Sequence, residues 1–265
     1  MAAVAHEAAA NLIPQVAIVG AVRIGVSTYS REPFPKQIEE AREAGYDYVE
    51  LDLTWVNWEP GKLRAEAEGF AKKIPLETAH FPPSHFHNAD LARFVGFMDA
   101  LAPVGTRVFN VHFLQARSAP TVSSDAKTSW LADLARAAKD RGVLVTVENL
   151  DETPEELRKV LDAVPDLAYC LDVGHAHLDK REDGGRTYLE ALGNRLGLVH
   201  LHDNHGGHGK EGDEHLPFGQ GTIDLERDVR ALKARYDGRA TLEIFKGTPD
   251  DRKACLRKMR RWARP

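Results

Sequence analysis

The sequence predicts an α/β fold with a single (β/α)8 barrel of the TIM type, in which parallel strands close into a cylinder inside a ring of helices. The chain has 265 residues, and such a barrel typically takes about 250. From Arg23 to the C-terminus, short β-rich apolar runs alternate with stretches of helical periodicity. No linker interrupts this alternation. We therefore expect one barrel domain over residues 22–265.

Residues 1–21 are expected to form an N-terminal extension. They are rich in Ala and Val, lack a basic start and contain His6 and Glu7, which argues against a secretory signal. Their apolar run is too short to cross a bilayer. We expect an extra helix or strand against the barrel floor, and the alternative hypothesis is that translation starts near Val22.

Eight strands are predicted along the barrel domain from short runs rich in β-branched and aromatic residues. The eighth run closes the barrel against the first, so no sheet edge is left unpaired. The predicted strands cover residues 23–29, 48–53, 76–80, 107–114, 144–150, 167–174, 198–204 and 240–245.

Amphipathic segments fill the intervals between these strands, and several of them end in Gly. One begins with a capping box, in which Thr153 precedes Pro154 and Glu156. Predicted helical segments include residues 35–45, 128–142, 153–164, 224–238 and 250–265.

A doubly wound open sheet is the alternative architecture. It predicts a Gly-rich phosphate-binding turn after the first strand. Residues 27–35, STYSREPFP, contain no Gly. The closed barrel is therefore favoured.

Composition and charge restrict the class of protein. The hydrophobic fraction of 43% and the mean hydropathy of -0.40 are typical of a soluble globular protein. The net charge of -5 provides no general attraction for a polyanion, so nucleic acid would need a local basic patch. Cys170 and Cys255 are too few for a disulfide framework and indicate thiols in a reducing compartment, by default the cytoplasm.

Residues suited to metal binding or proton transfer gather at the predicted carboxyl ends of the third to eighth strands. In a barrel these ends share one mouth, where active sites are built. The sequence therefore predicts a common cavity. The residues are His80, His112, Glu148, Asp172, His200, His202 and Glu243.

Each of these residues also has a structural interpretation. A single His at a strand end, such as His80 or His112, is more often a hydrogen-bonded wall residue than a ligand. Glu148 and Glu243 interrupt apolar runs, where an ion buried without a cation is costly. Nothing basic lies in the strand of Glu148 to neutralise it.

The chain around the sixth and seventh strands is rich in candidate ligands. We expect Gly174 to permit a sharp turn that brings His175 over the mouth, close to Asp172. His200 and His202 are two residues apart and share one face of a strand. A flexible His-rich loop without function is the alternative for the segment that follows. That segment contains Asp203, His205, His208, Asp213 and His215.

Carboxylates and imidazoles without a cysteine suit Zn, Mn, Co or Fe(II) at an open site. Two carboxylates beside a metal also fit proton transfer at a carbon next to a carbonyl. Residues 218–228 contain two glycines and Thr222 ahead of a helix, which suggests a phosphate site or, more commonly, an ordinary N-cap. Lys246 is either an anion contact or a surface lysine. Nucleophile-elbow, Walker, dinucleotide-binding and C-x-x-C motifs are absent from the sequence.

At these strand ends the sequence resembles the xylose isomerase-like TIM-barrel superfamily, over about residues 23–245. In its isomerase and epimerase branch, one divalent metal is held by Glu, Asp, His and Glu from successive strands. The resemblance implies that Glu148 and Glu243 also act as acid and base, and that His175 contacts the substrate. His202 and Lys246 are further substrate-binding candidates. The matching metal ligands are Glu148 of VENL, Asp172 of LDVGH, His200 of VHLHD and Glu243 of LEI.

The same superfamily contains the endonuclease IV type of AP endonuclease, which binds three zinc ions. The segment from His200 to Gly221 resembles its ligand-bearing stretch, but Glu214 stands where these enzymes carry Arg, and basic loops with interleaved aromatic residues are not found. The resemblance implies five further ligands. They are His80, His112, His175, Asp213 and His215.

The leading hypothesis is a metal-dependent isomerase or epimerase of a small sugar or sugar phosphate, working by proton transfer through a metal-stabilised enediolate. The alternative hypothesis is a multi-zinc AP endonuclease or phosphodiesterase, in which metal-bound hydroxide attacks phosphorus. One Zn or Mn ion is expected under the leading hypothesis, and up to three ions under the alternative. Only the alternative predicts a nucleic-acid partner, and neither predicts a membrane. A homo-oligomer is compatible with the sequence, and a purely structural metal site is the third hypothesis.

Overall fold

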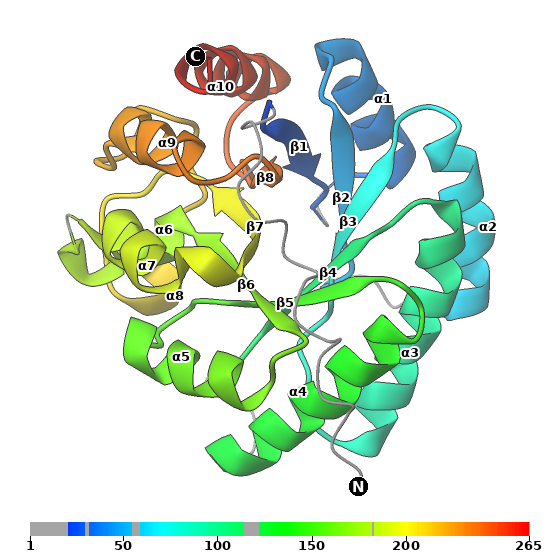
Figure 1. Ribbon diagram of the computed structural model, residues 1–265. Helices are drawn as coiled ribbons and strands as arrows, with labels where there is room; N and C mark the ends of the chain where they lie inside the picture. Colours follow the sequence, from blue (N-terminus) through cyan, green and yellow to red (C-terminus); the bar gives the residue numbers. More distant parts are fainter. Residues whose placement is uncertain (1–20, 30–31, 55–58, 114–121, 182, 265) are drawn as a thin grey trace, which may run out of the picture.

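The computed structural model describes residues 21–29, 32–54, 59–113, 122–181 and 183–264. Its strands form a closed barrel in the order β1 to β8, and each neighbouring pair is parallel. Figure 1 shows the strands inside a ring of helices. The predicted closed barrel is confirmed, and the open doubly wound sheet is excluded. The expected packing of residues 1–20 lies outside the described residues.

All eight predicted strands are present, most of them slightly shorter than the apolar runs. The sixth ends early because a helix begins directly at Val173, and the seventh starts at Leu196, before the predicted run. The strands are β1 Arg23–Ser27, β2 Tyr48–Asp52, β3 Leu76–His80, β4 Val108–His112, β5 Leu144–Glu148, β6 Leu167–Asp172, β7 Leu196–Leu201 and β8 Arg239–Leu242.

The helices alternate with the strands, and none of those described is both long and apolar enough to cross a membrane. The predicted capping box of Thr153 and Glu156 is present at the start of α5. The helices are α1 Phe34–Ala44, α2 Pro60–Ala71, α3 Asn88–Leu101, α4 Ser124–Lys139, α5 Pro154–Ala163, α6 Val173–His177, α7 Gly184–Leu192, α8 Gly209–Gly212, α9 Leu225–Lys233 and α10 Pro249–Trp262, with 3-10 segments at Ala102–Val104, Leu178–Lys180 and Gly193–Arg195.

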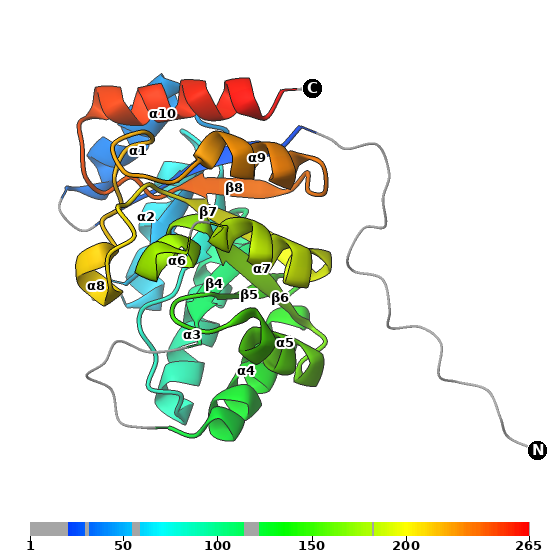
Figure 2. The ribbon, with the colours of Figure 1, turned by 90° about the vertical axis from the view of Figure 1, so that its left-hand side faces the viewer.

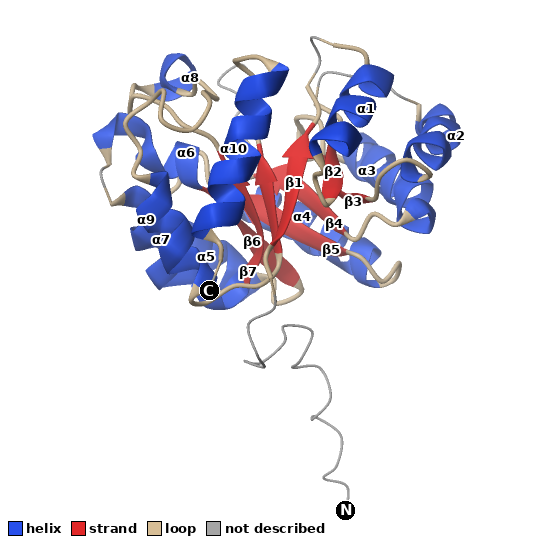
Figure 3. Cartoon of the chain, turned by 90° about the horizontal axis from the view of Figure 1, so that it is seen from above, coloured by secondary structure: helices blue, strands red, loops and turns tan. Residues whose placement is uncertain are grey.

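The short helices α6 and α8 occupy the end of the barrel where the site is expected. In Figure 3, α8 lies on the side towards which the strand arrowheads point. The side view in Figure 2 shows α8 apart from the outer ring that α9 and α10 belong to. The loops at the carboxyl ends of β6 and β7 therefore build up this end of the barrel.

The two faces of the strands have different roles. On one face, side chains such as Val49, Phe109 and Val199 join the large apolar core shared with the helices. The other face points into the barrel, where a small separate apolar cluster contains Val108 and Leu198. Buried polar side chains occupy the rest of this inner face. They include Glu50, Thr78, His80, Asn110, Thr146, Glu148, Asp172, His200, Thr241 and Glu243.

A glycine and a tyrosine close the barrel where the first and last strands meet. A Cβ atom on Gly25 would lie 2.3 Å from the ring of Tyr48, so no larger residue fits there. The Tyr48 hydroxyl is 2.8 Å from Oγ1 of Thr241 on β8. This buried hydrogen bond links β2 to β8 across β1.

One buried carboxylate organises the loop after β7. Asp203 is fully buried and accepts hydrogen bonds from the backbone amides of Asn204, Gly219, Gly221 and Ile223, at 2.7 to 3.1 Å. These glycine amides are therefore not free to bind a phosphate. Asp224 caps the following helix by accepting from the amide of Arg227, which agrees with the ordinary N-cap interpretation of residues 218–228.

We expect Asp203→Ala to lower the free energy of unfolding by about 3 kcal/mol or more, because several buried amides would lose their acceptor. Urea unfolding followed by circular dichroism measures this. Asp224→Ala is the matched control, since it removes only an exposed helix cap, worth about 1 kcal/mol. Equal losses in the two variants would contradict this account of the loop.

Candidate metal centre

The centre of the site is the imidazole of His200, on the inner face of β7. Its Nδ1 atom is 3.1 Å from Oε2 of Glu148, at the end of β5, and 3.2 Å from Oε1 of Glu243, after β8. All three side chains are buried. The barrel thus brings together three of the four residues predicted to hold one metal ion.

The fourth predicted ligand, Asp172, lies beside this group and faces a second one. It is in register with His200 on the neighbouring strand. Its Oδ1 atom accepts a hydrogen bond from the amide of His175 at 2.7 Å and lies 3.3 Å from Nε2 of His202. Asp172 groups closely with Glu148 and His175, but not with His200 and Glu243. The carboxylate is turned because it caps the N-terminus of α6.

Two histidines from β3 and β4 lie on the other side of Glu148. The Nε2 atoms of His80 and His112 are each 3.5 Å from a Glu148 oxygen and 3.1 Å from one another. Asn110 donates a hydrogen bond to Oε2 of Glu148, and Thr146 donates to Asn110 at 2.8 Å. Side chains of β4 and β5 therefore fix the position of the Glu148 carboxylate.

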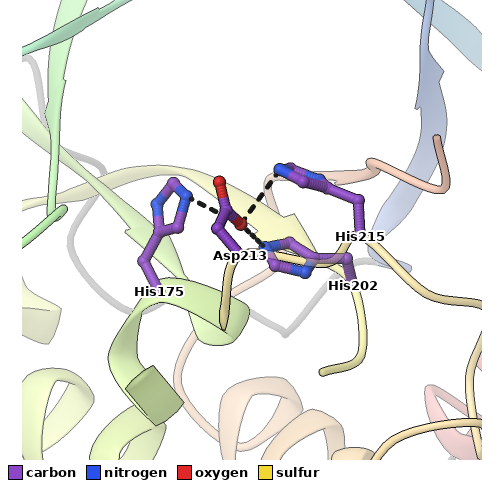
Figure 4. Close-up of side chains that lie close together, drawn as sticks. All are labelled: His175, His202, Asp213 and His215. Atoms are coloured by element: carbon purple, nitrogen blue, oxygen red, sulfur yellow. Dashed lines mark ion pairs between the residues drawn. The ribbon is translucent and has the colours of Figure 1, made fainter. Parts of the chain in front are cut away.

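A further group surrounds Asp213, in the loop after α8 (Figure 4). Its Oδ1 atom lies 3.5 Å from Nε2 of His175, 3.6 Å from Nε2 of His202 and 3.1 Å from Nε2 of His215. The rings of His202 and His215 stack with centroids 3.9 Å apart. These four residues can hold a cation by spacing. Asp213 and His215 of the His-rich loop therefore lie in the site, whereas His205 and His208 are exposed and pair with Glu214 and Asp179.

Gly174 has a different role from the one expected. It lies inside α6, immediately after β6, and makes no turn. A Cβ atom at this position would lie 2.1 Å from the ring of His202. The sharp-turn prediction is therefore wrong, because the missing side chain instead makes room for an imidazole. His175 reaches the site from the first turn of α6.

Several histidines are held so that one ring nitrogen points into the site. In each, the other nitrogen lies within hydrogen-bonding distance of a backbone carbonyl oxygen, an arrangement that fixes the orientation of metal-ligating imidazoles. The carbonyl partners are Phe81 for His80, Asn149 for His175, Asp203 for His202 and Glu243 for His215.

Buried polar atoms without hydrogen bonds are available to bind a cation. Among the described residues they include Glu148 Oε1, Asp172 Oδ2, His200 Nδ1, His202 Nε2 and Asp213 Oδ1. Such atoms are costly to bury alone. They are also the oxygen and nitrogen donors that divalent zinc or manganese accepts. The residues therefore fit a divalent metal centre.

The two glutamates have opposite pKa shifts. Burial opposes ionisation of Glu148, but the imidazoles of His200 and His112 hold its pKa well below the usual range. Burial raises the pKa of Glu243 to about 8, and the negative charge of Glu148 adds to the increase. Burial lowers the pKa of His80, yet its hydrogen bond and attraction to Glu148 raise it to about 9.

Lys246 lies at the rim. Its side chain is exposed, and its backbone amide donates a hydrogen bond to the carbonyl of His215 at 3.2 Å. Residues not predicted as part of the site are Glu50, Asn110, Asn149 and Cys170. Cys170 groups by spacing with Glu148 and His200, so the expectation of a site without a cysteine is wrong. Glu50 interrupts an apolar strand in the same way as Glu148, so this signal could have identified it.

The barrel and its mouth define a TIM-barrel protein with a candidate metal centre. The family model described as xylose isomerase-like TIM barrel matches residues 38–265, and the chain belongs to this family. A search of curated proteins gave no match.

Solved structures with the same fold include a D-tagatose 3-epimerase-like protein, with a TM-score of 0.73 and 21% identity over 90% of this chain and 97% of the other. The D-allulose 3-epimerase of Methylomonas sp. in complex with D-allulose has a TM-score of 0.68 and 21% identity over 86% and 85%. A Thermus thermophilus protein soaked with ZnCl2 has a TM-score of 0.70 and 20% identity, over 91% of this chain and 98% of the other. At these identities they show the fold alone.

Metal binding should release protons at neutral pH, because Glu243, with its pKa raised to about 8, is largely protonated in the metal-free protein. We expect zinc addition to release more protons at pH 7 than at pH 9. Calorimetry in buffers with different ionisation enthalpies measures this. Glu243→Gln should release about one proton fewer at pH 7, and an unchanged number would contradict this role of Glu243.

His200 should contribute more to the central site than His202. We expect His200→Ala to weaken the tightest zinc binding by about 100-fold or more, since it removes the nitrogen between the two glutamates. His202→Ala should have a smaller effect. Equilibrium dialysis against zinc distinguishes them, and the reverse order would show that His202 is the principal ligand.

Proposed function

We propose that this protein is a divalent-metal-dependent isomerase or epimerase of a sugar or sugar phosphate. The observation that carries the proposal is the pair of buried glutamates, Glu148 and Glu243, that converge on Nδ1 of His200. Two carboxyl groups beside a divalent ion are suited to proton transfer at a carbon next to a carbonyl. The sugar epimerases among the structural neighbours support the same class of reaction.

In this proposal the ionised Glu148 removes a proton from the carbon next to the substrate carbonyl, which gives an enediolate. Glu148, protonated by this step, returns the proton to the neighbouring carbon to give the isomer, or Glu243, after taking up a proton from solvent, delivers it to the opposite face of the same carbon to give the epimer. Asn110 and Thr146 keep the Glu148 carboxylate in place during both transfers. The products would be an isomer or an epimer, according to the face and the carbon that receive the proton.

Glu148, Asp172, His200 and Glu243 would hold the catalytic ion, zinc or manganese. A divalent ion there would polarise the substrate oxygens and acidify the adjacent carbon. Asp172 lies in register beside His200, and its Oδ2 atom, which has no hydrogen bond, is the atom we propose as the ligand.

We assign substrate contacts to residues nearer the rim. Lys246 is exposed and is suited to an anionic group such as a phosphate. His175 faces the Asp213 group through Nε2, and we propose that it contacts a substrate hydroxyl. His202 has no exposed surface, so its contribution would be indirect, through Asp172. Since Cys170 and Cys255 are free thiols, we place the reaction in the cytoplasm, in carbohydrate metabolism.

A multi-zinc phosphodiesterase is the second candidate, and one observation favours it. The groups around Glu148, His200 and Asp213 adjoin one another, so the site has enough ligands for up to three ions. Against it stands the net charge of -5, which provides no general attraction for nucleic acid.

Metal content separates the two candidates. We expect about one tightly bound Zn or Mn per chain in protein purified without chelator, measured by mass spectrometry of the metal. The double change His80→Ala and His112→Ala should leave this value unchanged if a single ion is held by the other group. About three zinc ions, together with incision of DNA at abasic sites, would instead support the phosphodiesterase.

Glu148→Gln should reduce isomerase activity by about 1,000-fold or more, since the base is lost while the shape of the side chain is kept. D-tagatose and D-allulose, named in the structural neighbours, are the first substrates to test. Glu214→Gln is the control, because that carboxylate pairs with the exposed His205. Full activity of Glu148→Gln, with an unchanged circular dichroism spectrum, would remove Glu148 from the mechanism.

A further inference from the structure

His200 differs from the other histidines of the site in what holds its second nitrogen. His80, His175, His202 and His215 each have a backbone carbonyl as partner. The partner of His200 is a side chain. Its Nε2 atom lies 3.2 Å from Oε1 and 3.3 Å from Oε2 of Glu50, on β2.

Glu50 lies on β2, against His200. It is fully buried on the inner face of β2, and its Oε1 atom has no hydrogen bond of its own. The nearest strand neighbour in register is Thr78. A buried carboxylate is costly unless it is paired, so its position against His200 requires an explanation.

The two nitrogens of His200 face different environments. Nδ1 points to Glu148 and Glu243, the carboxylates of the candidate metal centre. Nε2 points away from them, to Glu50. A neutral imidazole has one nitrogen that carries hydrogen and one with a free lone pair, and only the latter can bind a metal. The group that accepts the hydrogen therefore decides which nitrogen is the ligand.

We propose that Glu50 is a positioning residue that keeps the ring hydrogen of His200 on Nε2, so that Nδ1 faces the metal held by Glu148 and Glu243. By spacing Glu50 also groups with His200 and Glu243, but in this proposal it is not a ligand of that ion, because it lies against Nε2 of His200 and not against Nδ1. The inference rests on the metal dependence in the proposed function, but it does not depend on the substrate or the reaction.

Two variants separate hydrogen bonding from packing. Glu50→Gln keeps an oxygen acceptor for Nε2–H, whereas Glu50→Met has a similar length and no strong acceptor. The measurement is zinc affinity, by competition with a chromogenic chelator. We expect Glu50→Met to weaken binding by about 10- to 100-fold, the usual effect of losing an outer-shell partner, and Glu50→Gln to restore most of it.

Tyr48→Phe is the matched control. It removes a buried hydrogen bond from the same face of the same strand, to Thr241, and leaves His200 untouched. We expect lower resistance to urea with unchanged zinc affinity. Wild-type affinity in Glu50→Met, or equal losses in the Met and Gln variants, would overturn the proposal.

The tautomer of His200 can also be observed in the unaltered protein, which keeps the proposal testable if Glu50→Met does not fold. In zinc-loaded protein labelled with 15N-histidine, we expect the His200 signals, assigned by their loss in His200→Gln, to show hydrogen on Nε2 and zinc on Nδ1. Hydrogen on Nδ1 would overturn the proposal. Since neither measurement uses a substrate, a failure of the proposed isomerase activity would be distinguishable from a failure of this inference.

Discussion

Charge buried at the mouth of the barrel is the constraint on which the site depends. His200 is fully buried and lies within 3.3 Å of the carboxylates of Glu50, Glu148 and Glu243. Three carboxylates cannot all be ionised in so small a space without positive charge to balance them. In the metal-free protein, protons on His200 and Glu243 supply part of that balance. A divalent cation would replace them, which connects the electrostatics of the fold to the proposed chemistry.

The barrel supplies this arrangement through its register and through polar contacts one layer away. Pairing of β6 with β7 sets Asp172 beside His200, and pairing of β4 with β5 sets His112 beside Glu148. Asn149 adds to this by donating a hydrogen bond to the carbonyl of Asp172 at 2.9 Å. The outward face of the same strands packs in the apolar core. The outward face of these strands therefore contributes to stability, and the inward face carries the residues of the site.

Much of the fold and part of the site could be predicted from the sequence. Strand and helix periodicities are local signals, and the carboxyl ends of barrel strands meet at one mouth, so the gathering of Glu148, His200 and Glu243 followed from counting strands. The rotation of Asp172 could not be predicted, because it depends on a cap that forms only when α6 starts directly after β6. The packing of Gly174 against His202 is likewise a contact between segments distant in the sequence.

Glu148 uses both of its oxygens. Oε1 lies 3.0 Å from His175 and 3.5 Å from His112, and Oε2 lies 3.1 Å from His200 and 3.5 Å from His80. One carboxylate is thus shared by neighbouring sets of donors, so an ion accepted on one side would alter the electron density offered to the other. By thermodynamic linkage the influence is reciprocal. Occupancies of the subsites that contain Glu148 would then be cooperative, because this one side chain belongs to each of those subsites.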